Sequence, residues 1–283
     1  MSFSLIWQTT RFTLDLTQPR VMGIVNLTPD SFSDGGRFNE VKAAVAHCEQ
    51  LLSEGADILD LGGESSRPGA ASVDEAQEWR RVQPVIQEIV GWGCPISLDT
   101  TKPGVMRRAL DLGVDIINDI RALQSPGAVD AVAEARCGVC LMHMQGQPET
   151  MQIQPGYDDV IADVARFLLG RAQVVQASGV AASRIVLDPG IGFGKSVAHN
   201  FALLQHQQQL LALGFPLLAG WSRKSALGAV TGREASQRMP ASVAAALAAV
   251  LHGARVVRVH DVAATVDALK VWRAAGLPQS NVQ

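Results

Sequence analysis

Short apolar runs recur along the chain, and each is followed by a segment with a helical pattern. The runs are rich in Ile, Val and Leu, which is typical of parallel strands buried on both faces. We predict strands at 21–26, 57–61, 95–99, 115–118, 139–143, 185–188, 216–220 and 255–259.

The segments between these runs place apolar residues at helical spacing and close at a glycine. In the first of them, Val41, Val45, Cys48 and Leu52 recur at that spacing, and Gly55 follows as a C-cap. This pattern of helical spacing closed by a glycine recurs and predicts helices at 38–53, 73–90, 158–177, 242–251 and 262–275.

Eight βα units in one chain predict a (β/α)8 TIM barrel, an α/β fold that forms one domain over 1–283. The alternative is an open doubly wound sheet. Polar residues near the carboxyl ends of the strands favour the barrel, because closure brings those ends to one rim. They are Asn26, Glu64, Asp99, Asn118, His143, Asp188, Lys224, Arg258 and His260. Within 1–20, segments 3–7 and 10–16 are expected to form a hairpin that plugs the bottom of the barrel.

Composition narrows the class of protein. Of 283 residues, 47% are apolar and 18% charged, which suits a large core and excludes a disordered chain. The net charge of −3 argues against a nucleic-acid-binding surface. The chain shows neither an apolar run long enough for a membrane span nor a signal peptide, so we expect a cytoplasmic protein.

Cys137 and Cys140 form a C-x-x-C pair. A redox pair or half of a zinc site is one interpretation. The pair enters a predicted strand rather than opening a helix, and no second pair follows. We therefore favour two buried structural cysteines.

Asp99 and Asp188 each end a strongly apolar run. With Asn118 they form an acceptor-rich floor that suits a heterocycle presenting several N–H donors. Each also has a structural interpretation. Asp99 precedes a helix that starts at Pro103 and resembles its N-cap, and Asp188 stands before the Pro-Gly of a turn.

The glycine-rich segment 190–195 meets neither of two phosphate-binding motifs. Walker A needs a glycine where Pro189 stands, and G-x-G-x-x-G needs one where Lys195 stands. We predict a rim loop with Phe193 exposed. Two further loops, 26–36 and 62–69, are dense in Ser, Gly and charged residues. In them Asn26 offers an oxygen to Mg²⁺ and Arg67 a fork for an oxyanion.

Cations occur on the last two units, in Ser222-Arg223-Lys224-Ser225 and Arg258-Val259-His260. From Gly220 onward the chain has eight Lys/Arg and only three Asp/Glu, against 24 and 27 in the whole sequence. Arg258 and His260 alternate on a strand and so point the same way. A clamp for a diphosphate is one interpretation, and ordinary salt bridging at the rim is the other.

Together these residues resemble the dihydropteroate synthase family. The segments are 23–36, 62–69, 99–100, 118–120, 141–144, 188–195, 222–225 and 258–261, and they match the family's signatures in order over essentially the whole chain. One departure is Ser66, where the family usually has Thr. The hydroxyl is kept and a methyl group is lost.

The resemblance implies a transferase that joins p-aminobenzoate to 6-hydroxymethyl-7,8-dihydropterin diphosphate, with dissociative loss of diphosphate. It implies Mg²⁺ near Asn26, a homodimer and a sulfonamide target. Catalytic roles fall on Lys224, Arg258 and Asp99. The pterin is expected at Asp99, Asn118, Ile120, Met142, Asp188, Lys224 and Arg258. The p-aminobenzoate pocket is expected at Phe32, Ser66, Pro68, Phe193, Ser222 and Lys224, and the diphosphate at Asn26, Arg67, Arg258 and His260. Asp34 belongs to the first loop.

Two other functions compete. A pterin-dependent methyltransferase on a similar barrel shares the pterin floor but does not need the diphosphate cations. A catalytically silent pterin- or protein-binding barrel would not need motifs at all the strand ends. Small-molecule substrates, without nucleic acid or membrane, remain the expected partners.

Overall fold

The structure, a computed structural model, describes residues 5–28, 37–65, 69–70 and 72–276. Eight parallel strands close into a barrel in the order β10-β3-β4-β5-β6-β7-β8-β9. They are β3 (Arg20–Asn26), β4 (Ile58–Gly62), β5 (Ile96–Asp99), β6 (Ile116–Asp119), β7 (Gly138–Met142), β8 (Ile185–Asp188), β9 (Leu217–Ala219) and β10 (Ala254–Val259). The predicted (β/α)8 fold is confirmed, and each predicted strand end lies within one residue of the observed one.

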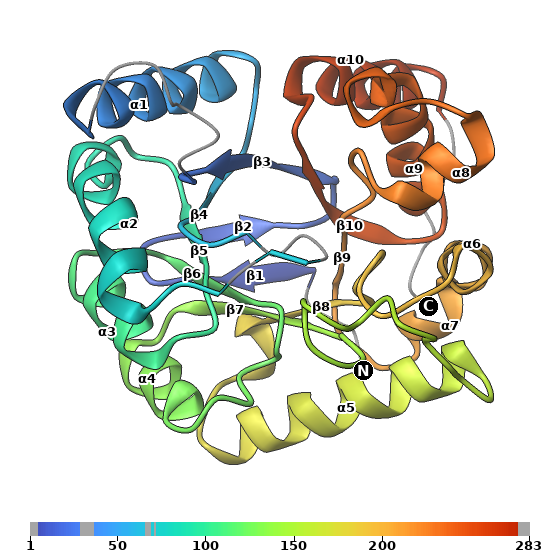
Figure 1. The fold of residues 1–283 in the computed structure, drawn as a ribbon, viewed down its shortest axis with the longest axis horizontal. Coiled ribbons are helices and arrows are strands. Elements are labelled where there is room, and N and C mark those ends of the chain that lie inside the picture. The colour runs from blue at the N-terminus through green and yellow to red at the C-terminus, as the bar shows by residue number, and fades with distance from the viewer. Residues whose placement is uncertain (1–4, 29–36, 66–68, 71, 277–283) are drawn as a thin grey trace.

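Helices surround the strands (Figure 1). They are α1 (Arg37–Ser53), α2 (Glu75–Ile89), α3 (Pro103–Asp111), α4 (Ala128–Ala135), α5 (Val160–Ala177), α6 (Val197–Gln205), α7 (Gln208–Leu211), α8 (Ser225–Thr231), α9 (Met239–Leu251) and α10 (Val262–Ala274). The five predicted helices correspond to α1, α2, α5, α9 and α10.

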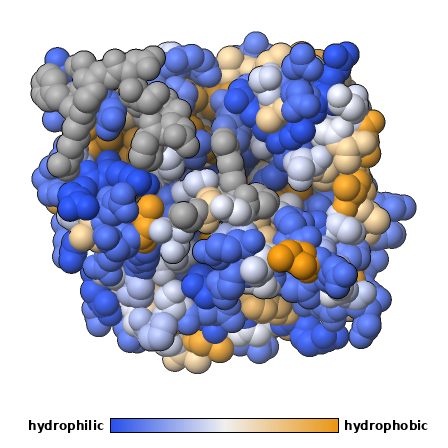
Figure 2. Space-filling model, viewed as in Figure 1, coloured by the Kyte–Doolittle hydropathy of each residue, from blue (hydrophilic) through white to orange (hydrophobic). Residues whose placement is uncertain are grey.

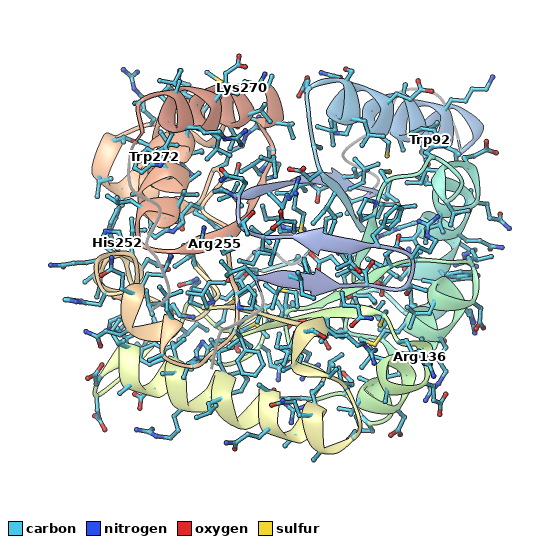
Figure 3. All side chains as sticks on the ribbon, turned by 180° about the vertical axis from the view of Figure 1, so that it is seen from behind. Trp92, Arg136, His252, Arg255, Lys270 and Trp272 are labelled. Carbon is cyan, nitrogen blue, oxygen red and sulfur yellow. The ribbon has the colours of Figure 1, made fainter. Side chains whose placement is uncertain are left out.

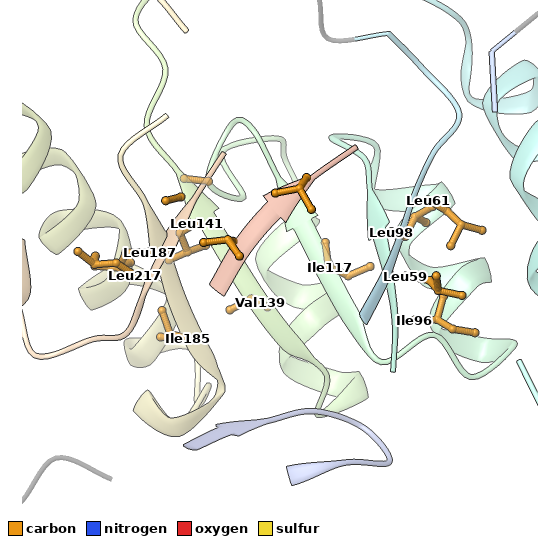
Figure 4. Packing of buried hydrophobic residues seen from close by; sticks show 14 of the residues in the cluster. Leu59, Leu61, Ile96, Leu98, Ile117, Val139, Leu141, Ile185, Leu187 and Leu217 are labelled. Atoms are coloured by element: carbon orange, nitrogen blue, oxygen red, sulfur yellow. The ribbon is translucent and has the colours of Figure 1, made fainter. Parts of the chain in front are cut away.

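Alternate residues of each strand enter two separate cores, because successive side chains point to opposite faces. The outer core lies between strands and helices. Its strand residues include Leu59, Leu61, Ile96, Leu98, Ile117, Val139, Leu141, Ile185, Leu187 and Leu217 (Figure 4). The inner core, inside the barrel, contains Met22, Ile58, Ile116, Cys140, Val186, Leu218 and Val256.

The predicted hairpin forms from β1 (Ile6–Gln8) and β2 (Thr13–Asp15), which pair antiparallel. Its Trp7 and Leu16 are fully buried in the inner core. Trp7 donates its indole N–H to the Arg184 carbonyl at 3.0 Å. Arg255, at the start of β10 (Figure 3), donates to the Thr17 carbonyl at 3.3 Å. The segment therefore seals the end of the barrel where the strands begin.

Cys137 and Cys140 are buried free thiols, as the structural interpretation requires. Burial raises the pKa of Cys137 to about 11, so its thiolate is disfavoured. Over the described ranges, no helix is long and apolar enough to cross a bilayer. The face in Figure 2 is mostly hydrophilic, with hydrophobic residues in small scattered groups.

Candidate active site

The inner face of the barrel changes from apolar to polar in a single two-residue step toward the carboxyl ends of the strands. Ile58 of the inner core is followed two residues on by Asp60, and Ile116 by Asn118. Val186 and Val256 are followed in the same way by Asp188 and Arg258. Because residues two apart share a face, these polar side chains gather at the mouth of the barrel.

Arg258 joins two carboxylates across this mouth. Its Nε lies 2.6 Å from Asp60 Oδ2, and one Nη lies 2.9 Å from Asp99 Oδ2. Asn118 Nδ2 approaches the same Asp60 oxygen at 3.4 Å. Strands β4, β5, β6 and β10 thus meet in one polar cluster, which contains three predicted residues.

Burial sets the electrostatics of this cluster. Desolvation raises the pKa of Asp99, and the nearby charge of Arg258 only partly offsets it. Desolvation also disfavours the charged form of Arg258, but Asp60 and Asp99 outweigh it and raise the pKa of the guanidinium. Burial raises the pKa of Asp188. The hydrogen bond from the Gly190 N–H and the positive charge of Lys224 lower it, but they do not outweigh burial.

Sequence reasoning missed Asp60, which is fully buried and is the carboxylate closest to Arg258. It lies inside the apolar run Ile-Leu-Asp-Leu-Gly rather than at its end. A lone carboxylate within a buried strand was the available signal, because such a charge requires a partner.

The N-cap interpretation of Asp99 is wrong. The cap of α3 is Lys102, and the Asp99 carboxylate instead faces Arg258. For Asp188 the turn interpretation holds in part, because one of its oxygens accepts from the Gly190 N–H at 2.7 Å.

Phe193 was predicted to be exposed, and this is also wrong. It is 8% exposed and packs in a small apolar cluster with Ile120, Met142 and Met151. The structure thus joins the expected p-aminobenzoate residue to the expected lining of the pterin slot. The Lys224 ammonium lies 4.1 Å from the centre of the Phe193 ring. Burial, with the charge of Arg258, lowers the pKa of Lys224 to about 8.

Lys195, to which sequence reasoning gave no role, holds the Phe193 loop in place. Its buried Nζ donates to the Gly190 carbonyl at 2.9 Å and the Phe193 carbonyl at 3.1 Å, and contacts His143 Nδ1 at 2.9 Å. His143 was expected near the site, and it serves here as a support for this loop. Gly190 cannot carry a side chain, since a Cβ would lie on the His143 carbonyl.

Ser222 and His260, from the two predicted segments that carry the cations, contact each other. Ser222 Oγ lies 3.0 Å from His260 Nδ1 and accepts from the His260 backbone N–H at 3.1 Å. Glu64, by contrast, pairs with Lys102 at 2.5 Å. Asn26 ends β3 on the same face as Met22. Predicted residues that lie outside the described part of the chain are Phe32, Asp34, Ser66, Arg67 and Pro68.

The described site therefore combines acceptors and cations at one mouth. Carboxylates at Asp60, Asp99 and Asp188 suit the N–H edge of a flat heterocycle. Lys224 and His260, on the neighbouring loops, suit an anionic group. The Phe193 cluster supplies an apolar surface beside the Lys224 ammonium.

Comparison with known proteins agrees with this chemistry. A family model described as pterin binding enzyme matches residues 22–260, a range that contains most of the barrel. Dihydropteroate synthase from Neisseria meningitidis serogroup B is 57% identical over 279 residues, covering 96% of this chain and 98% of the relative. The chain belongs to the dihydropteroate synthase family.

Solved structures of the family are closely similar. Xanthomonas albilineans dihydropteroate synthase with 4-aminobenzoic acid has a TM-score of 0.89 and 54% identity, covering 94% of this chain and 96% of that one. The Yersinia pestis enzyme in a sulfonamide drug complex has a TM-score of 0.91 and 46% identity, covering 96% and 100%. Membership confirms the predicted class, a transferase that forms dihydropteroate.

Proposed function

We propose that the chain joins p-aminobenzoate to 6-hydroxymethyl-7,8-dihydropterin diphosphate by a dissociative route. The bond between the pterin methylene carbon and the diphosphate oxygen breaks first, and its electron pair leaves with the diphosphate. The aniline nitrogen of p-aminobenzoate then forms the new carbon–nitrogen bond and releases a proton to solvent.

In this proposal the pterin binds at the polar floor, which is formed by Asp99, Asn118 and Asp188. Its exocyclic NH2 and ring N–H groups donate to Asp99 and Asp188, while Asn118 completes the edge. Ile120 and Met142, which pack in one apolar cluster with Phe193, then line the flat face of the ring. The buried carboxylates also stabilise the cation that remains after diphosphate departs.

Cations receive the charge of the leaving group. Arg258 stacks on the pterin and presents its free edge to the diphosphate, and His260 and Arg67 complete the clamp. Asp60 and Asp99 orient the Arg258 guanidinium before substrate arrives, because they already hold two of its nitrogens. Preorganised charge of this kind lowers the barrier without reorganisation.

The second substrate binds beside Phe193, Ser222 and Lys224, with Phe32, Ser66 and Pro68 bounding the pocket. No general base is required, because an aniline nitrogen is already neutral at pH 7. Ser66 and the aromatic wall accept a sulfonamide as they accept p-aminobenzoate. The sulfonamide complex of the Yersinia pestis relative supports this part of the proposal.

Mg²⁺ fits the site as a partner of the diphosphate. Among the residues that the structure describes, no group of three His, Cys, Asp or Glu side chains forms a cage for it. Mg²⁺ is commonly held by one or two protein oxygens together with substrate phosphates. The Asn26 side-chain oxygen would be such a ligand, and the ion would supply positive charge to the diphosphate leaving group.

We also propose a cytoplasmic homodimer. Val271 on α10 is 69% exposed and Ala275 is exposed, and with the half-buried Trp272 they would contribute apolar area to a subunit face. Light scattering after size exclusion measures the mass in solution. A monomer at micromolar concentration would contradict the dimer.

The observation that carries the reaction is Arg258 held between Asp60 and Asp99 beside the cations of the next loops. The test is release of diphosphate on mixing the pterin diphosphate, p-aminobenzoate and Mg²⁺. Release that requires p-aminobenzoate is expected. Binding of pterin without turnover would favour the silent barrel, and methyl transfer from methyltetrahydrofolate would favour the methyltransferase.

A further inference from the structure

Arg223 stands between two predicted site residues and has a strained backbone. It follows Ser222 and precedes Lys224, and its φ of 58° lies in the left-handed region that favours glycine. An arginine persists there only where its surroundings hold it, and such residues concentrate at functional sites. The reaction proposed above gives Arg223 no role.

Four hydrogen bonds with described residues hold Arg223, and none of these is to Asp99, Asn118 or Asp188. Its Nε and one Nη lie 3.1 and 2.6 Å from the two carboxylate oxygens of Asp261. Its backbone N–H donates to Ser242 Oγ at 2.9 Å. Its carbonyl accepts from Arg238 at 3.1 Å. The fork toward Asp261 is the geometry in which arginine is most specific.

The Arg223–Asp261 pair extends the barrel beyond the ends of its strands. In the parallel register of β9 and β10, Ala219 pairs with Val257. The same offset places Ser222 opposite His260 and Arg223 opposite Asp261. Side chains make both contacts there, through the Ser222–His260 hydrogen bonds and the Arg223–Asp261 ion pair. Two rungs made by side chains thus continue the ladder after the strands end.

We propose that Arg223 is a positioning residue, which through Asp261 fixes the spacing between Lys224 on one loop and His260 on the next. The proposal rests on the proposed function, because that spacing sets where p-aminobenzoate lies relative to the diphosphate. Neither Arg223 nor Asp261 touches substrate in this account.

The Arg223–Asp261 ion pair is partly exposed, which distinguishes a positioning role from a contribution to folding stability. The Arg223 and Asp261 side chains are 39% and 15% exposed, so the ion pair contributes little to the free energy of unfolding. The backbone bonds to Ser242 and Arg238 remain when the Arg223 side chain is removed. The variants are therefore expected to fold, with Tm lowered by about 2 °C or less.

The test compares Arg223→Ala, Arg223→Gly, Arg223→Lys and Asp261→Asn. Loss of the fork is expected to raise KM for p-aminobenzoate about tenfold, as small misplacements of a bound group do. The Kd for a pterin without diphosphate is expected to stay within about twofold. Asp99, Asn118 and Asp188 lie on β5, β6 and β8, and Arg258 is held by Asp60 and Asp99 rather than by Arg223. Arg223→Lys keeps the charge and is expected to recover part of the loss.

The glycine variant separates the side chain from the backbone. Arg223→Gly relieves the left-handed strain while deleting the fork, and Arg223→Ala deletes the fork alone. An equal rise of KM in both variants supports the positioning role of the Arg223–Asp261 ion pair. Near-normal KM in Arg223→Gly with a raised KM in Arg223→Ala would show that only backbone shape matters. The double variant Arg223→Ala/Asp261→Asn is expected to be no worse than either single variant, since both break one contact.

Arg20→Ala is the matched control. It breaks the Arg20–Asp57 ion pair, which has a 2.9 Å distance and side chains 31% and 28% exposed, at the other end of the barrel. It is expected to leave KM for p-aminobenzoate unchanged.

A KM within twofold of the parent in both Arg223→Ala and Asp261→Asn would overturn the proposal. So would a parallel rise of KM and pterin Kd, which indicates general loosening. If the parent protein itself releases no diphosphate, the proposed reaction fails. Calorimetric binding of p-aminobenzoate in the presence of pterin and diphosphate then still tests the positioning role of the Arg223–Asp261 ion pair.

Discussion

The two halves of the barrel interior are built from the same strands but use opposite chemistry. Toward the strand starts, Ile58, Ile116, Val186 and Val256 pack with Trp7 of the hairpin in one apolar cluster. Two residues further along, the same faces carry Asp60, Asn118, Asp188 and Arg258. A single two-residue step along a strand therefore separates the apolar part that holds the barrel together from the polar part that we propose binds ligand.

This difference predicts that substitutions in the apolar half mainly lower stability, whereas substitutions in the polar half mainly lower binding and activity. The apolar half contributes through burial, at about 25 cal/mol per Å² of apolar surface removed from water. The polar half holds the buried Asp60 and Asp188 and the largely buried Asp99 with their partners, which favours binding and charge stabilisation over folding.

Trp7→Ala should give the largest effect, and in stability. The indole is fully buried and hydrogen-bonded to Arg184. Removing it leaves a cavity, and we expect a loss of about 3–5 kcal/mol in the free energy of unfolding. Urea unfolding measures that loss. The folded fraction should bind pterin diphosphate normally, and a weaker Kd would show that the two halves are coupled.

Asp99→Asn should act on the other half. The amide keeps the shape but presents a donor to the ligand's donors, and we expect affinity for pterin diphosphate to fall by about 2–4 kcal/mol. Burial raises the pKa of Asp99, so the charged carboxylate does not favour folding. Little change in Tm is therefore expected, because Arg258 keeps its contact with Asp60. Calorimetric affinity within threefold of the parent would remove Asp99 from the site.

Arg258→Lys sharpens the distinction between binding and rate. Lysine keeps the charge but not the planar fork that contacts Asp60 and Asp99. Because negative charge grows on the departing diphosphate in the transition state, loss of the fork that receives it should lower kcat about 10²-fold. Ground-state affinity should change less. Steady-state kinetics and calorimetry together measure both quantities. A normal kcat would show that Arg258 only forms structural ion pairs at the barrel rim.

The pH dependence gives a smaller effect with opposite signs for activity and stability. The pKa of Lys224 is lowered from 10.5 to about 8 in the folded chain. Above pH 8 its ammonium is lost, and kcat/KM should fall about tenfold for each pH unit. Between 8 and 10.5 the unfolded chain holds the proton and the folded chain does not, so Lys224's contribution to stability rises with pH. Melting curves of Lys224→Met should show an advantage over the parent at pH 7 that shrinks by pH 10.

The fold was predictable because its signal is repeated. Each barrel strand is an apolar run bounded by turn residues, so the sequence placed its ends to within one residue. Even Trp7 and Leu16 fall in predicted hairpin strands. The polar floor was predictable where a carboxylate ends a run, as Asp99 and Asp188 do. Asp60 was missed because it lies one step inside its run.

The remaining errors come from contacts between distant segments. Phe193 sits in a glycine-rich loop that is typical of an exposed rim, and its burial depends on Ile120, Met142 and Met151. The role of Lys195 depends on carbonyls that only the folded loop brings together. The partner of Arg223 lies 38 residues away, where only the barrel register identifies it.

One measurement tests the division of the barrel interior most directly: the Kd for pterin diphosphate in two variants of β6, Ile116→Val and Asn118→Ala. The two side chains share a face two residues apart, in the apolar and polar halves. We predict that Ile116→Val leaves Kd within about twofold and costs about 0.5–1.5 kcal/mol of stability. Asn118→Ala should weaken Kd by about 1–3 kcal/mol at nearly unchanged Tm. An equal loss of affinity in both variants would contradict the division.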